Sequence, residues 1–104
     1  MKLIQLRTLE DLVRLLGSSP SIGAIQHTSL EGRHIYFVLG GTFRETFIYY
    51  VVKEEEVQGK YIVYNGITGE IFPSKRLRTE PNLTSIPIIE IEKQDVFSKA
   101  ILEG

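Results

Sequence analysis

The sequence predicts an α+β fold, in which an antiparallel sheet of about five to six strands lies between an N-terminal and a C-terminal helix. Almost all of the aromatic residues fall between residues 34 and 72, where they alternate with Ile and Val. Gly and Asn-Gly breaks divide this stretch into short runs, as in a meander of strands. Helical apolar spacing occurs only outside it, at residues 9–16 and 95–102.

The composition is that of one ordinary globular domain. The 104 residues are 42% hydrophobic and 24% charged, with a formal net charge of -1. We therefore expect a single domain over residues 1–104. The absence of Cys excludes disulfides, thiolate nucleophiles and iron–sulfur ligation. The lack of Cys and Trp, together with a single Met, would suit a heat-adapted source.

The first predicted element is a short amphipathic helix. Thr8 can cap it, and Glu10 and Asp11 suit its positive first turn. Gly17 ends the apolar pattern, which consists of Leu9, Leu12, Val13 and Leu16. Residues 2–6 are either an extended lead-in or an earlier start of the same helix, and residues 18–21 form a loop.

Strands are predicted over residues 25–30, 33–39, 43–53, 60–64, 67–72 and 86–92. Glu31-Gly32 and Asn65-Gly66 are expected to make tight two-residue hairpin turns, because these residues tolerate positive φ. Pro73 is expected to stop one strand, and Pro87 favours an edge or the first position of the last. Residues 54–59 form a charged connection, residues 74–85 a surface loop, and residues 95–102 a terminal helix.

The predicted strands are apolar on both faces, which two short helices cannot cover. Either the sheet curls on itself into a barrel-like shape, or its second face meets another chain. The second alternative predicts a homodimer or another protein partner, since exposed apolar patches mark interaction sites. The candidate interface residues are Tyr36, Tyr49, Tyr50, Tyr61 and Tyr64.

A weak polar cluster is predicted at the first hairpin. If Glu31-Gly32 is a two-residue turn, Ser29 lies opposite His34 and His27 lies opposite Tyr36, all on one face. A third metal ligand is missing from this pattern, as are a nucleophile elbow and an oxyanion hole, so we expect no metal site and no catalytic residues. Glu45 and Glu70 are expected to form ion pairs and not a catalytic pair.

The basic residues Lys75, Arg76 and Arg78 are the candidates for nucleic-acid binding. They stand on a loop near a tyrosine-rich sheet, and charge combined with aromatic stacking is typical of single-strand binders. The acidic run 54–56 offers a different use, because it can pair with this loop in a second copy.

No catalytic or cofactor motif is present, so the leading hypothesis is a non-enzymatic protein that acts through self-association and protein binding. Nucleic-acid binding is the alternative. We expect no cofactor and no contact with a membrane, because no apolar run approaches the length of a spanning helix. Without a secretory pattern near Met1, the cytoplasm is the expected location.

Overall fold

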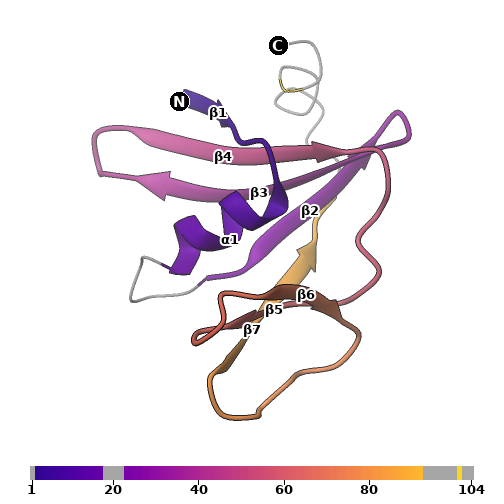
Figure 1. Ribbon diagram of the computed structural model, residues 1–104. Coiled ribbons are helices and arrows are strands. Elements are labelled where there is room, and N and C mark those ends of the chain that lie inside the picture. Colours follow the sequence, from indigo (N-terminus) through magenta and orange to yellow (C-terminus); the bar gives the residue numbers. More distant parts are fainter. Residues whose placement is uncertain (1, 18–22, 93–100, 102–104) are drawn as a thin grey trace.

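The computed structural model describes residues 2–17, 23–92 and 101. They form one helix and one seven-stranded sheet (Figure 1). The elements are, in chain order, β1 (Lys2–Gln5), α1 (Leu9–Gly17), β2 (Ile25–Leu30), β3 (Arg33–Gly41), β4 (Thr46–Lys53), β5 (Tyr61–Asn65), β6 (Ile71–Ser74) and β7 (Leu83–Glu90). Residues 2–5 are therefore extended, and the predicted helix 95–102 lies outside the described residues apart from Ile101.

The sheet is mixed, so the prediction of a purely antiparallel sheet is wrong. Its strand order is β1-β4-β3-β2-β7-β5-β6. The two parallel pairs, β1 with β4 and β2 with β7, join strands that are far apart in the chain. Pairs of sequence neighbours, such as β2 with β3 and β3 with β4, are antiparallel as expected. A meander pattern reveals only hairpin pairs, because a parallel pair needs a long crossover that leaves no local signal.

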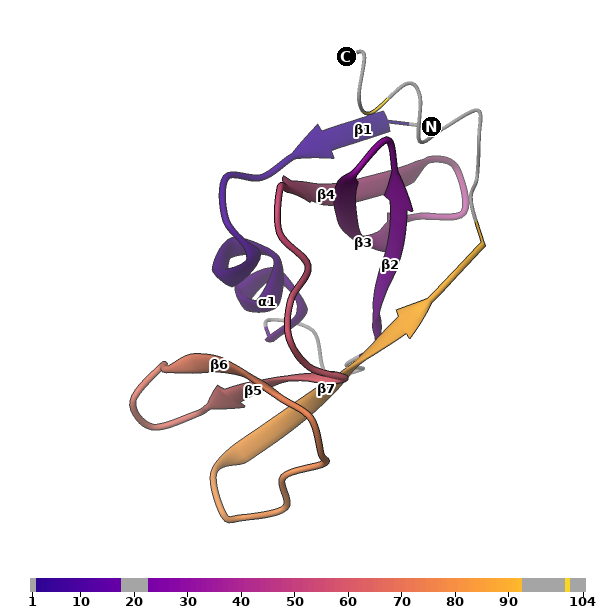
Figure 2. The same cartoon turned by 90° about the vertical axis from the view of Figure 1, so that its right-hand side faces the viewer.

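The sheet curls around α1, and this covers its inner face. Figure 2 shows α1 between the part of the sheet formed by β2–β4 and the part formed by β5 and β6. The inner core takes side chains from the helix and from both parts of the sheet: Leu9, Leu12, Val13, Ile25, Tyr36, Val38, Val51, Ile62 and Ile86. The outer face carries a second, smaller core of Ile35, Phe37, Ile48 and Tyr50, against which Ile101 packs. The apolar residues of these two clusters, one on each face, are therefore buried within the chain.

The turn between β5 and β6 is wider than the predicted two-residue turn. The side-chain oxygen of Asn65 accepts the N–H groups of Ile67 at 2.9 Å and Thr68 at 3.1 Å. Gly69 then turns the chain back at φ 76°, and β6 starts only at Ile71. Asn65 therefore makes a side-chain turn in place of a tight hairpin. Pro73 lies within β6, which tolerates it because β6 is an edge strand.

β7 joins the two parts of the sheet. Its residues 83–87 pair with β5 and its residues 88–90 pair with β2. Pro87 was expected at an edge or at a strand's first position, but it lies inside this central strand. It stands at the switch between the two partners, and the next N–H, of Ile88, donates to Lys60 O at 2.9 Å. Proline has no backbone N–H to donate, and Pro87 stands at the point where β7 changes its pairing from β5 to β2.

Candidate functional site

The β2–β3 hairpin brings two histidines together on the inner face of the sheet. Its turn is the predicted Glu31-Gly32 pair, with φ values of 54° and 78° that suit a tight hairpin. The register places His27 opposite Tyr36 and His34 opposite Ser29, as predicted. Ser29 is exposed and makes no hydrogen bond to either imidazole in the part of the chain that the structure describes. The hydroxyl is therefore not part of the cluster.

The two imidazoles are in direct contact. His27 Nε2 lies 3.0 Å from His34 Nδ1, and the two rings are stacked with centroids 5.2 Å apart. The His27 ring also stacks on Tyr36, at a centroid distance of 4.5 Å and an interplanar angle of 16°. His27 is only 3% exposed, whereas His34 is half-buried. The aromatic stack therefore fixes both rings, with His34 on the solvent side.

Two carboxylates from distant segments complete the cluster. Glu90, the last residue of β7, places Oε2 2.5 Å from His27 Nδ1. Glu56 comes from the connection between β4 and β5, and its carboxylate forms a group with the nitrogens of His27 and His34 in which all ligand atoms lie within 4.8 Å of one another. The sequence pattern showed no third candidate ligand beside the histidines, and the structure places the Glu56 carboxylate there. Glu56 is 22 residues beyond His34, and only the path of the connection brings it near.

Tyr36 holds the connection that carries Glu56. The Val57 N–H, one residue after Glu56, donates to the Tyr36 hydroxyl oxygen at 2.8 Å. Burial raises the pKa of Tyr36 above its ordinary value, and the nearby charges of Glu56 and Glu90 raise it further, while the hydrogen bond from Val57 opposes the shift. The phenol stays neutral at physiological pH and serves as a fixed acceptor below the cluster.

The structure distributes the five candidate interface tyrosines differently from the sequence expectation. Tyr36 and Tyr50 are 1% and 5% exposed, so their assignment to an exposed interface is wrong. They fill the two cores on opposite faces of the sheet. Tyr49, Tyr61 and Tyr64 are half-buried.

The β3–β4 hairpin carries two exposed large apolar side chains, one of them the most exposed of that kind among the described residues. Phe43, in its turn, is 95% exposed, and Leu39 on β3 is 57% exposed. Leu39 also lines a cavity of about 520 Å³ near the turn end of β3, together with Tyr49 and with Leu15 of α1. No charged side chain lines this cavity among the described residues. We call Leu39 and Phe43, the two exposed large apolar residues of this hairpin, the hairpin patch.

The basic loop is partly neutralised. Lys75 and Arg76 are exposed, but Arg78 Nε donates to Glu80 Oε1 at 2.7 Å and its guanidinium lies 5.7 Å from the centre of the Phe72 ring. The hydrogen bond from Arg78 lowers the pKa of Glu80 to about 2. A phosphate group would compete with Glu80 for Arg78, so two of the three predicted contacts are open. Nucleic-acid binding by this loop stays an untested prediction.

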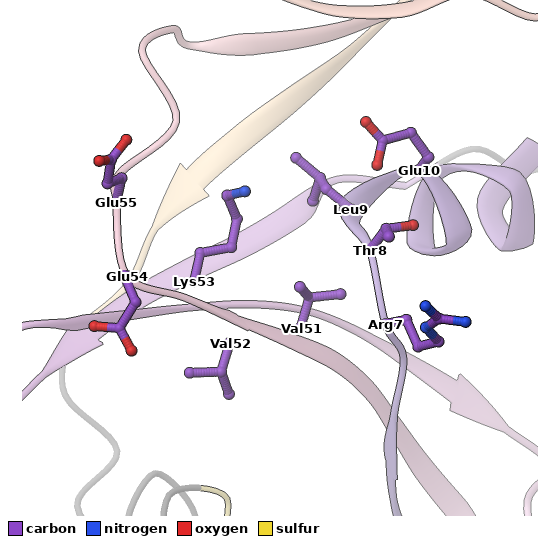
Figure 3. A pocket seen from close by; sticks show the side chains of 9 residues that line it. All are labelled: Arg7, Thr8, Leu9, Glu10, Val51, Val52, Lys53, Glu54 and Glu55. Atoms are coloured by element: carbon purple, nitrogen blue, oxygen red, sulfur yellow. The ribbon is translucent and has the colours of Figure 1, made fainter.

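Glu45 and Glu70 stand in different turns of the sheet, between β3 and β4 and between β5 and β6. Glu45 was expected to form a cross-strand ion pair with Arg44, Lys53 or Lys60, but its carboxylate lies 3.8 Å from Lys2 Nζ of β1. Glu70 is exposed in the β5–β6 turn. A cavity of about 440 Å³ lies between the β1–α1 connection and the end of β4, where Glu54 and Glu55 stand apart from Glu10 (Figure 3). Its charged groups do not converge on one point.

No protein-family model matches the chain, and comparisons with curated proteins and with solved structures find no significant match. Within the described residues, no helix is long and apolar enough to cross a membrane.

Proposed function

We propose that this chain is a non-enzymatic protein that acts by associating with a second copy of itself through the hairpin patch. The observation that carries the proposal is the 95% exposure of Phe43 at the hairpin turn. Full burial of a Phe side chain contributes about 1.5–3 kcal/mol, so leaving it in water forgoes a large stabilisation. Large apolar side chains held out in this way favour an interaction site. We keep the cytoplasmic location expected from the sequence as part of the proposal.

A second copy is the occupant that this surface suits best. The projecting Phe43 and the uncharged cavity beside Leu39 belong to the same hairpin, so a two-fold axis lets each copy insert its ring into the other's cavity. Arg44 and Glu45, which follow Phe43, carry opposite charges. A copy turned by 180° can therefore place each beside its opposite.

The test is the oligomeric state of the wild type and of Phe43→Ser, measured by sedimentation from low to high micromolar concentration. Ile67→Ser is the matched control, because Ile67 is 75% exposed in the separate β5–β6 turn. We expect the wild type and the control to dimerise with rising concentration, while Phe43→Ser stays monomeric. A wild type that remains monomeric at high micromolar concentration would overturn the proposal. A dimer that Phe43→Ser leaves intact would place the interface elsewhere and contradict the role of the hairpin patch.

A further inference from the structure

We propose that His27, His34 and Glu56 bind a divalent transition-metal ion such as Zn²⁺, with Glu90 positioning His27. The inference is independent of the proposed self-association, because the hairpin patch shares no residue with this group. Two imidazoles and one carboxylate form the ligand set that such ions take in three-ligand sites, with a fourth position left for water. Imidazole nitrogens favour zinc-like ions over Mg²⁺ and Ca²⁺, which prefer oxygen ligands.

The contact between the two imidazoles is the first argument. When His27 Nδ1–H donates to the Glu90 carboxylate, the Nε2 atom carries a lone pair that points toward His34. Without an ion, His34 Nδ1–H donates a hydrogen bond to this lone pair at 3.0 Å, and a bound cation would take the place of that proton. Two nitrogens bound to one tetrahedral zinc ion at their usual bond lengths stand about 3.3 Å apart. The observed 3.0 Å between the two atoms is close to that separation.

The second argument is the contact of the Glu90 carboxylate with Nδ1 of His27. Metal-bound histidines usually donate their other ring N–H to a carboxylate, which sets the tautomer and orients the ring. Glu90 occupies this position at Nδ1 of His27, the ring nitrogen that does not face His34. The 3% exposure of His27 and its stacking on Tyr36 further restrict the ring. The buried ligand is thus oriented before any ion arrives.

The third argument is that the cluster is open to solvent. His34 is half-buried and Glu56 is exposed, so an ion can reach the cluster from solvent without the core opening. Glu56 and Glu90 also line a cavity of about 490 Å³ that extends to Lys60 and Lys75. The water on the fourth position would have room there to exchange with a small anion.

The experiment uses the full chain without an affinity tag, freed of metal by a chelator. We expect isothermal titration with Zn²⁺ to give one ion per chain, and Co²⁺ to develop the visible absorption of a tetrahedral complex. Mg²⁺ should give neither signal. His34→Gln and Glu56→Gln should each abolish one-to-one binding. We expect Glu90→Gln to weaken binding by about 10–100-fold, because it changes the orientation of His27 and removes no ligand.

Glu55→Gln is the matched control, since it removes the same charge from the adjacent residue of the acidic run while Glu55 lies outside the cluster. It should bind Zn²⁺ like the wild type. Circular dichroism of each metal-free variant will check that it is folded. His34 and Glu56 are substituted, and not the buried His27, because a change at a less buried residue disturbs the fold less. The proposal is overturned if the wild type binds no Zn²⁺ at one-to-one stoichiometry, if His34→Gln binds as well as the wild type, or if Glu55→Gln loses as much affinity as Glu56→Gln.

Discussion

Some side chains in this protein are held by partners that are near in the sequence, and others by partners that are distant in the sequence. Arg78 and Glu80 are two residues apart and form a hydrogen-bonded ion pair on the surface loop. His27 and Glu90 are 63 residues apart and meet only because β7 runs beside β2. The first pair can be expected from the sequence, since both residues lie on one short loop. The second depends on the sheet order.

Glu80 should titrate far below an ordinary glutamate. The hydrogen bond from Arg78 favours its charged form and lowers its pKa from the ordinary value of 4.5 to about 2. Because the folded-state pKa is lowered, the stabilisation from this pair is complete above pH 4.5 and is lost as pH falls through about 2. The check is an NMR titration of the Glu80 carboxyl group in the wild type and in Arg78→Gln, where the midpoint should return toward 4.5.

Arg76→Gln is the matched control for this titration. Arg76 contributes only the last of the causes that lower the pKa of Glu80, so its removal should move the midpoint slightly. If Arg78→Gln and Arg76→Gln shift the midpoint equally, the general charge of the loop determines the pKa and not the hydrogen bond.

The elements depend on a few backbone positions that are not visible in the hydrophobic pattern. The β3–β4 turn is closed by Thr42 N–H donating to Glu45 O at 2.9 Å, next to Gly41 at φ 114°. The predicted strands end at residue 39 and resume at residue 43, whereas β3 continues through Gly40 and Gly41 before the turn. Of the two glycines, only Gly41 has a positive φ, and the hydrophobic pattern does not distinguish it from Gly40.

Gly41→Ala should destabilise the hairpin. A Cβ at Gly41 would lie 2.2 Å from Glu45 O and 3.0 Å from Phe47 Cδ2, and the φ of 114° is strained for any other residue. We expect a loss of about 1–3 kcal/mol in the free energy of unfolding, because backbone strain and the lost turn hydrogen bond add. Urea denaturation at low micromolar concentration measures it.

Gly66→Ala serves as the control in the other long turn. The nearest atom to its added Cβ is Asn82 O at 3.6 Å, an ordinary contact. Its free energy of unfolding should change by less than about 0.5 kcal/mol. Equal losses for the two variants would contradict the assigned role of Gly41.

At the scale of the whole molecule, one core joins the two parts of the curled sheet. Side chains of α1, β2, β3 and β4 share it with Ile62 of β5 and Ile86 of β7. The polar cluster stands at its end and draws on the same strands, since β2, β3 and β7 carry His27, His34 and Glu90. The position of these side chains therefore depends on the curl, and the molecule should unfold as one unit.

Ile86→Ala tests this unity. Ile86 is 1% exposed, and truncating a buried Ile costs about 2–5 kcal/mol. We expect one cooperative urea transition, with the same midpoint by circular dichroism and by tyrosine fluorescence, shifted to lower urea. Ile89→Ala, on the same strand but 49% exposed, should shift the midpoint much less. Two separate transitions in the wild type would show that β5–β7 and β2–β4 unfold independently.

The sequence by itself determined the local structure of this protein. The amphipathic helix, the β2–β3 hairpin with its Glu31-Gly32 turn and the pairing of His27 with Tyr36 all follow from spacing and turn residues, which act between near neighbours. It also determined that the strands are apolar on both faces, which left open whether curling or a partner covers them.

Only the tertiary structure decided how those apolar faces are covered and what surrounds the histidines. The curl of the sheet buries Tyr36, and the parallel pairing of β2 with β7 brings Glu90 to His27. The hydrogen bond from Val57 to Tyr36 brings Glu56 to the same place. These contacts join residues 21 to 63 positions apart. Hydrophobic periodicity reports the face of a strand but not its neighbours, so strand order and the path of a connection are settled only when the chain packs.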